Sequence, residues 1–382
     1  MKVAGDWLGH SGTQSLMQAL EAAGHKALFV GGCVRNALMQ VPVADIDLAT
    51  DALPQTVTEL AQAADFKVVP TGIDHGTVTV IAHGKPHEVT TFRRDVETDG
   101  RRAVVAFSAE IEEDAQRRDF TMNAIYADRQ GMVIDPLNGL PDARARRVRF
   151  VGDPETRIRE DYLRILRFFR FHAAYGDQRE GIDADGLAAC AALAEGLGTI
   201  SKERIGAEMR KLLSAGYPAT ALAAMEQSGV LARILPGADS RAIGPLTEVE
   251  ADLDTDWLRR LAALGGEDPT ENLRLSRAEA RDLATLRDAI GSMDSPAVLG
   301  WRLGHARAVD ALLLRAAVLE QPLRLLALQD ARRGAEEVLP VTAADLMPDL
   351  HGEQLGARLK DLQARWLASD LTLTRDDLLK GA

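Results

Sequence analysis

The chain of 382 residues is long enough for two or three domains with well-buried cores, and its 46% of hydrophobic residues is ordinary for a folded protein. A formal net charge of -12 argues against a protein that coats nucleic acid through general electrostatics. No run of residues approaches the roughly 20 apolar positions of a membrane span, which argues against membrane insertion.

The two cysteines, Cys33 and Cys190, lie far apart and match neither a disulfide framework nor a set of zinc ligands. A reducing compartment suits them best. The N-terminal residues lack an apolar core of signal-peptide length. We therefore expect a cytoplasmic protein.

The first part of the chain alternates helical and extended patterns. Helical spacing is found at 11–24, 33–40 and 54–65, and strand patterns at 26–30 and 44–50. The segment 76–92 is typical of a β-hairpin that turns near Gly84 to Pro86. These elements predict a head that combines helices with a mixed sheet.

From residue 153 onward almost every segment has a helical pattern rich in Ala, Leu and Arg. We expect a domain boundary near Gly152 and a second one within 234–246, where Pro, Gly and Asp cluster. The predicted fold class is α+β, with a head over 1–150, a helical neck over 151–235 and a helical body and tail over 236–382.

Asp45 and Asp47 are the first candidates for chemistry. Residues two apart on a strand point to the same face, so both carboxylates would converge on one spot. Held roughly 5 to 7 Å apart, two like charges repel unless a cation lies between them. Mg²⁺ is the usual cation because it takes oxygen ligands. A lone pair of this kind is more often a solvated strand face, so the neighbouring residues decide.

Glu88 and a glycine turn are such neighbours. On an adjacent strand Glu88 would supply a third carboxylate, and its segment HEVTT lacks the second histidine of a zinc-protease helix. Gly31 and Gly32 join a strand to a helix, and such a turn offers backbone N–H groups to an anion. Arg35 adds a bidentate phosphate donor. A plain tight turn is the alternative, and the dinucleotide fingerprint G-x-G-x-x-G is absent.

Basic residues gather further along the chain. Nine arginines face five acidic residues between Asp142 and Arg170, which makes this segment a candidate for binding an anion. The earlier run Arg117, Arg118 and Asp119 is either part of such a site or a surface cluster that caps a helix.

The segment EDYLRILRFFRF carries a charged stripe. Asp161, Arg164, Arg167 and Arg170 recur every three residues, whereas nearly all positions between them are apolar. A helix that is apolar on most sides is buried, so its charged stripe faces a partner or a cleft. Salt bridges within the fold are one possibility, but three arginines against one aspartate leave positive charge for a ligand.

Taken in order, the motifs resemble the bacterial class II tRNA nucleotidyltransferases, which are CCA-adding enzymes and close relatives of bacterial poly(A) polymerases. The resemblance spans nearly the whole chain. It rests on FVGGCVRNAL, ADIDLATDALP, HEVTTFR, DGRRAVVAF, RRDFTMNAIY, IDPLNGLPDARARRVRFVGDP, REDYLRILRFFRF and ISKERIGAEMRKLL, and the C-terminal region is similar to the tail of that family.

The resemblance implies a polymerase-β-like head that binds Mg²⁺ through Asp45 and Asp47, with Glu88 as the third carboxylate. The implied contacts to CTP and ATP are Gly32, Arg35, Arg118, Asp161, Arg164, Arg167 and Arg170. The implied activity is addition of CCA to the 3′ end of tRNA with release of pyrophosphate. The segment 94–107 corresponds to the family's flexible loop, and the helical body and tail are implied to hold tRNA.

The chemistry of the bases supports Asp161 and Arg164 as the implied base-reading pair. Cytosine and adenine each present an amino donor beside a ring-nitrogen acceptor, whereas uracil and guanine present a carbonyl beside an N–H donor. An aspartate acceptor next to an arginine donor therefore suits C and A, and leaves both side chains unpaired against U or G.

Three alternatives stay open at this point. A poly(A) polymerase and a partial CC- or A-adding enzyme share the same head, and an RNA-binding module that has lost catalysis is a different class. The three carboxylates argue against the last. One departure is Asn36, which stands where the family usually has aspartate after the Val-Arg pair, and another is Ala103 in place of a common proline.

Overall fold

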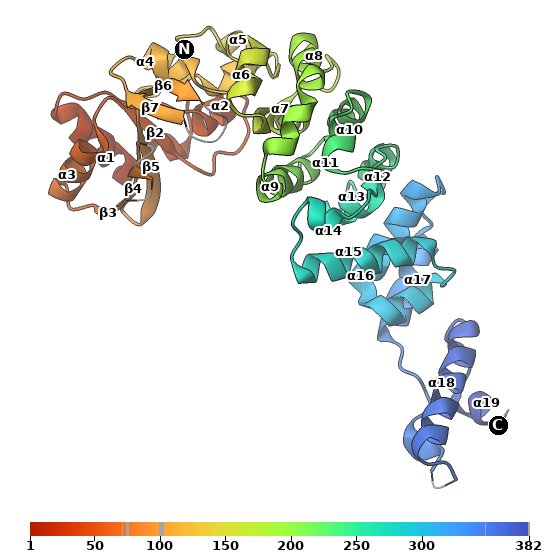
Figure 1. The fold of residues 1–382 in the computed structure, drawn as a ribbon. Coiled ribbons are helices and arrows are strands. Elements are labelled where there is room, and N and C mark those ends of the chain that lie inside the picture. Colours follow the sequence, from red (N-terminus) through yellow and green to blue (C-terminus); the bar gives the residue numbers. More distant parts are fainter. Residues whose placement is uncertain (71, 74–75, 99–102, 348, 381–382) are drawn as a thin grey trace. The chain divides into compact units, whose positions relative to one another are not determined.

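The computed structural model describes residues 1–382 except 71, 74–75, 99–102, 348 and 381–382. The chain divides into two compact units, Met1–Ile234 and Leu235–Ala382, and each is described by itself. The first unit contains the sheet and the helices nearest to it, and the second is built from helices (Figure 1).

The head contains a seven-stranded sheet in the order β3-β4-β5-β2-β1-β8-β9. Its strands are β1 (Ala27–Val30), β2 (Asp47–Thr50), β3 (Lys67–Val69), β4 (Thr77–Ala82), β5 (Lys85–Thr91), β8 (Tyr126–Ala127) and β9 (Val133–Ile134). β2 and β5 pair in parallel and the other neighbours are antiparallel, which confirms the mixed sheet. The β4–β5 hairpin turns at His83 and Gly84, both with positive φ, as the sequence predicts.

Helices cover the sheet. α1 (Ser11–Ala22) contacts β1 and β4, and α3 (Pro54–Ala63) contacts β3, β4 and β5. α3 starts with Pro54 at its first position, where the missing N–H costs no hydrogen bond. A second set of apolar side chains packs against α4 (Ile111–Gln116): Leu28, Val30, Ala49, Phe92, Ala124 and Tyr126. β2, which carries the aspartate motif, is thus fixed in the middle of a packed sheet.

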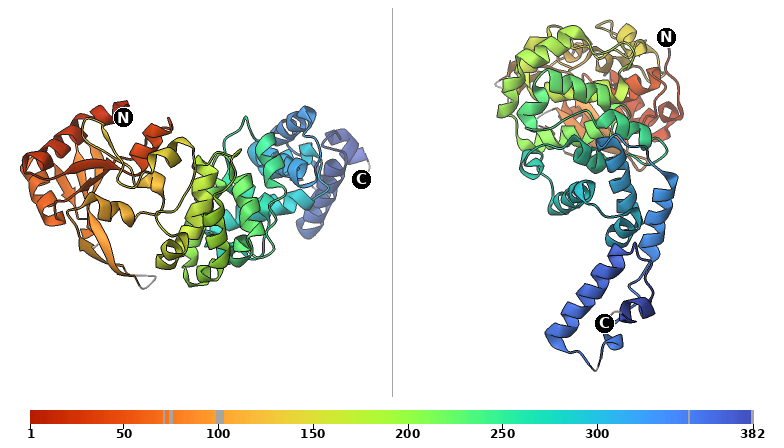
Figure 2. Two further views of the ribbon diagram at one scale, coloured as in Figure 1. Left: turned by 90° about the horizontal axis from the view of Figure 1, so that it is seen from above. Right: turned by 90° about the vertical axis from the view of Figure 1, so that its right-hand side faces the viewer.

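The segment predicted as a flexible loop forms a two-stranded ribbon at both of its ends. β6 (Arg93–Thr98) pairs antiparallel with β7 (Ala103–Phe107), with a shift of register between Asp95 and Glu97. The ribbon leaves the head as the orange pair of strands in Figure 2 (left). The part of the predicted loop at 99–102 lies outside the described residues.

The neck helices complete the first unit. They are α5 (Leu140–Arg144), α6 (Pro154–Glu160), α7 (Leu163–Tyr175), α8 (Ala184–Ala192), α9 (Lys202–Leu213), α10 (Pro218–Gln227) and α11 (Val230–Ile234). α7 packs on α9 and α10, and its phenylalanines Phe168 and Phe171 stack with Phe120 and Phe150 of the head. The prediction that this helix is largely buried is confirmed.

The second unit contains α12 (Ile243–Val249), α13 (Trp257–Leu264), α14 (Pro269–Asn272), α15 (Arg277–Gly291), α16 (Pro296–Val318), α17 (Leu325–Glu336), α18 (Gly352–Ala368) and α19 (Arg375–Lys380). A buried ion-pair network of Arg259, Arg260, Glu250 and Asp310 ties α13 to α16. In the described part of the chain, every helix is too short or too polar to cross a membrane.

Two glycines allow α16 and α17 to pack with their backbones in contact. A Cβ added at Gly334 would lie 1.8 Å from the carbonyl oxygen of Ala297, and one at Gly300 would lie 2.0 Å from that of Ala331. We expect Gly334→Ala to lower the free energy of unfolding of this unit by about 1–3 kcal/mol, because the helices must separate. Thermal or urea unfolding checks this. Gly356→Ala on α18 is the control, since no atom lies within 4 Å of its added Cβ and alanine favours helix; equal loss in both variants would contradict the prediction.

Candidate active site

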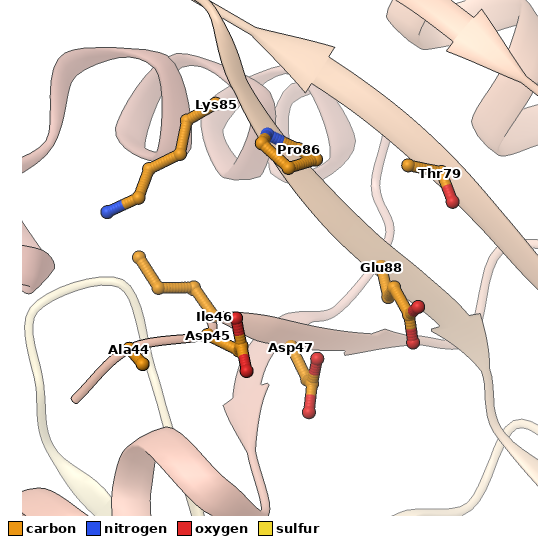
Figure 3. A pocket seen from close by; sticks show the side chains of 8 residues that line it. All are labelled: Ala44, Asp45, Ile46, Asp47, Thr79, Lys85, Pro86 and Glu88. Atoms are coloured by element: carbon orange, nitrogen blue, oxygen red, sulfur yellow. The ribbon is translucent and has the colours of Figure 1, made fainter. Parts of the chain in front are cut away.

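Three carboxylates line one pocket of about 480 Å³ beside the middle of the head sheet. Asp47 is the first residue of β2 and pairs in register with Glu88 of β5. Asp45 lies in the segment just before β2, so the expectation that both aspartates sit on the strand holds only for Asp47. Figure 3 shows the three carboxylates in a row, with Asp47 in the middle. The pocket is lined by Ala44, Asp45, Ile46, Asp47, Thr79, Lys85, Pro86 and Glu88.

The electrostatics of this row suit a divalent cation. Burial raises the pKa of Asp47 to about 6, and the negative charges of Glu88 and Asp45 raise it further against the effect of Arg118. Oxygen donors with an excess of negative charge are the ligands that Mg²⁺ prefers. Within the residues that the structure describes, no three acidic, histidine or cysteine side chains are already placed to hold a metal ion. The carboxylates therefore fit the ion by donor type and charge.

The repulsion within this row predicts an effect on stability. The pKa of Asp47 is raised in the folded protein, so its charge destabilises the fold above about pH 6, and this penalty is absent below its unfolded pKa of about 3.8. In EDTA at pH 8 we therefore expect Asp47→Asn to unfold a few degrees higher than the parent chain, with no difference at pH 3.5. Differential scanning fluorimetry across this pH range measures it. A lower Tm for Asp47→Asn at pH 8 would contradict the prediction.

The glycine turn lies on the other side of β2, between β1 and α2 (Gly32–Leu38). Gly31 has a φ of 69°, which favours glycine. An added Cβ there would lie 3.5 Å from Nη1 of Arg118, so the predicted Arg118 is brought to the turn. Arg118 donates to Asp114 (Nη2 to Oδ2, 2.9 Å) and from Nε to the Tyr126 hydroxyl (3.1 Å). These bonds fix its guanidinium beside the turn.

Arg35 has different surroundings. Its side chain is buried, and Nη1 donates to Oδ1 of Asn123 (2.6 Å) while Nε donates to Oδ1 of Asn36 (3.1 Å). The guanidinium lies over the ring of Tyr175 on α7, 3.9 Å from its centroid. Burial lowers the pKa of Arg35. Arg35 thus connects head and neck through neutral acceptors and an aromatic face, and its contact with phosphate stays a prediction.

The charged stripe is not one continuous helix. α6 ends at Glu160, Asp161 is extended (φ -156°, ψ 104°), and α7 begins at Leu163. The Asp161 carboxylate accepts from the backbone N–H of Leu163 (3.1 Å), a short-range bond that favours the break. Asp161 therefore lies at the junction of two helices, and the remaining stripe residues follow on α7.

The inference that the stripe leaves positive charge for a ligand is wrong, because each of its arginines has a carboxylate partner from outside the stripe. Arg164 pairs with Glu160, Arg167 with Asp119 of the head, and Arg170 with Glu208 of α9. Asp161 itself pairs with Arg204 of α9 (2.7 Å). The stripe is therefore neutralised within the first unit.

Arg204 and Glu208 were not among the predicted site residues, and the signal for them was weak. Both lie on one helix, in ISKERIGAEMRKLL, about 40 residues after the stripe. Their four-residue spacing places them on the same side of α9. Opposite charge at matched spacing on two amphipathic helices is the pattern that pairs them with Asp161 and Arg170.

The sheet, the carboxylate row and the glycine turn define a nucleotidyltransferase-type head, and two family models match within the chain. Residues 27–149 match the poly A polymerase head domain, and residues 181–241 match the "probable RNA and SrmB-binding site of polymerase A".

Similar proteins cover most of the chain. It is 32% identical to the mitochondrial CCA tRNA nucleotidyltransferase 1 of Mus musculus, over 96% of this chain and 89% of the relative. A crystal structure of the Bacillus stearothermophilus CCA-adding enzyme in complex with CTP superimposes with a TM-score of 0.74 at 30% identity, over 94% of this chain and 93% of the other. The Thermotoga maritima CCA-adding enzyme complexed with tRNA shares the fold, with a TM-score of 0.70 at 17% identity over 97% and 93% of the two chains. The chain belongs to the class II CCA-adding enzyme and poly(A) polymerase family.

Proposed function

We propose that this protein adds CCA to the 3′ end of tRNA from CTP and ATP, with release of pyrophosphate and without a nucleic-acid template. The observation that carries the proposal is the row of three carboxylates beside a glycine turn, in a chain similar to CCA-adding enzymes over nearly its whole length. Family members that add only A share the head, so the tRNA assay below distinguishes them.

The catalytic roles fall to the carboxylate row. Asp45 and Asp47 would hold Mg²⁺, and Glu88 lies beside Asp47 to complete the acidic wall. When bound, Mg²⁺ activates the RNA 3′-hydroxyl and neutralises charge on the leaving pyrophosphate. The backbone N–H groups at Gly31 and Gly32 orient the triphosphate, and Arg118 adds positive charge at the same turn.

Base choice is assigned to Asp161 and Arg164. Asp161 accepts from the exocyclic amino group and Arg164 donates to the ring nitrogen of C or A. Their bonds to Arg204 and Glu160 hold Asp161 ionised and keep both side chains at the junction of α6 and α7. Arg167 and Arg170 follow on α7 as further nucleotide contacts, which requires them to exchange carboxylate partners for phosphate.

The remaining parts serve RNA binding and location. We assign catalysis to residues 1–150, base reading to 151–235 and tRNA binding to the helical body and tail over 236–382. Two buried thiols, Cys33 and Cys190, suit a reducing compartment, and cytoplasm is the proposed location.

Sequencing of reaction products tests the activity. The protein is incubated with Mg²⁺, CTP, ATP and tRNA transcripts that end at the discriminator base, and the 3′ ends are sequenced. Addition of CCA is expected. Addition of CC alone, A alone or an A-tail would each replace the proposal by a different enzyme of the family, and unextended tRNA would indicate a binding module.

A further inference from the structure

The order of the strands places two different surfaces on the two sides of β2. The glycine turn and Arg118 belong to β1 and its side of the sheet, whereas Glu88 and the rest of the pocket belong to β5 and β4. Neighbouring strands lie about 4.8 Å apart, so β1 and β5 are separated by roughly 10 Å, with the Asp47 carboxylate between them. A reaction that joins two substrates at Asp47 therefore has a separate surface for each.

The β5 side contains a cation that the activity has not used. Lys85 begins β5 and lines the same pocket as the three carboxylates. Its side chain is half-buried and extends toward Ile46 in Figure 3. Within the described ranges, its ammonium group forms no hydrogen bond or ion pair, although three carboxylates share the pocket.

A basic group at one end of an acidic pocket fits a ligand whose charge is distributed in the same way. The acidic wall with its metal attracts the hydroxyl that is to be activated, and the ammonium attracts an anion one unit away from that hydroxyl. The 3′ end of RNA has this pattern, since its terminal hydroxyl is followed by the phosphodiester to the preceding nucleotide. A nucleoside triphosphate has its anionic groups on the other side of the reacting phosphorus, toward the glycine turn.

We propose that Lys85 binds the phosphodiester next to the 3′-terminal nucleotide of the RNA and thereby positions the attacking hydroxyl beside Asp47 and Glu88. The inference deepens the proposed function and depends on it. Lys85 is a positioning residue, and its contact is with RNA and not with the incoming nucleotide.

The test compares Lys85→Ala and Lys85→Arg with Lys67→Ala as the matched control. Lys67 is an exposed lysine on β3 of the same sheet, outside the pocket. Steady-state kinetics give KM for tRNA and for CTP separately, and equilibrium binding of tRNA is measured over a range of KCl concentrations. For Lys85→Ala we expect KM for tRNA to rise about 5- to 30-fold with KM for CTP changed less than twofold.

The salt dependence identifies the contact as phosphate. Loss of one phosphate contact to a single strand lowers the slope of log Kd against log salt by about 0.7, and Lys85→Arg restores most of it. A rise in KM for CTP instead, an unchanged slope, or an equal effect of Lys67→Ala would overturn the proposal. Should Lys85→Ala unfold, Lys85→Gln removes the charge with similar volume. The binding measurement needs no turnover, so an enzyme that adds a tail other than CCA still tests Lys85.

Discussion

Replacing Asp47 with alanine is expected to abolish nucleotide incorporation, with a loss of at least about 1,000-fold in kcat, while binding of tRNA survives. Asp47 is the central carboxylate of the row and the neighbour of Glu88 in the parallel pair β2–β5. Without it, Mg²⁺ loses a charged ligand and the 3′-hydroxyl is not activated. Single-turnover incorporation of radiolabelled CTP, with tRNA binding measured in parallel, gives both quantities.

The control for Asp47→Ala is Glu59→Ala, which removes an exposed carboxylate from α3 in the same head. Glu59→Ala is expected to retain full activity. Incorporation by Asp47→Ala at near the parental rate would show that the metal is bound elsewhere. Loss of tRNA binding together with incorporation would point to a misfolded head, which the Tm of each variant reports.

Replacing Asp161 with alanine is expected to relax base choice toward U and G. Asp161 is the acceptor that suits the amino group of C and A, and a buried group left unpaired against the wrong base costs roughly 1–3 kcal/mol. Its loss should therefore lower the preference for CTP over UTP by about 10- to 100-fold. The measurement is kcat/KM for each of the four nucleotides on tRNA that ends at the discriminator base.

Asp177→Ala is the control for this experiment, because Asp177 is also paired with a neighbouring arginine of the first unit but lies outside the site. Arg204→Ala adds a second comparison, since it removes the partner of Asp161 and leaves the carboxylate in place. Discrimination that is unchanged in Asp161→Ala would show that the base is read by other residues.

The local patterns of the head could be predicted from the sequence. The alternation of apolar residues and the turn at Gly84 depend on neighbouring positions, and these were sufficient for the mixed sheet and the β4–β5 hairpin. The paired strands β6 and β7 replace much of the predicted loop, because the resemblance identified the segment by its place in the family and not by its strand pattern.

Contacts between distant segments were less predictable. The break at Asp161 was missed because the apolar residues on both sides continue with helical spacing, whereas one side-chain bond to Leu163 favours an extended residue. The partners of the stripe come from Asp119 and Glu208, tens of residues away on either side. Lys85 was included in a hairpin, and only the arrangement of strands shows that it shares a pocket with Asp45.

The ion pairs of α7 have a consequence for how long a nucleotide stays bound. Because Arg164, Arg167 and Arg170 already have carboxylate partners, a nucleotide binds by exchange of one anion for another, and only the difference between the two interactions contributes to affinity. Exchange also works in reverse, since Glu160, Asp119 and Glu208 remain next to the arginines and compete with the bound phosphate. A site of this kind releases its occupant readily, which suits an enzyme that must accept CTP twice and ATP once at the same side chains.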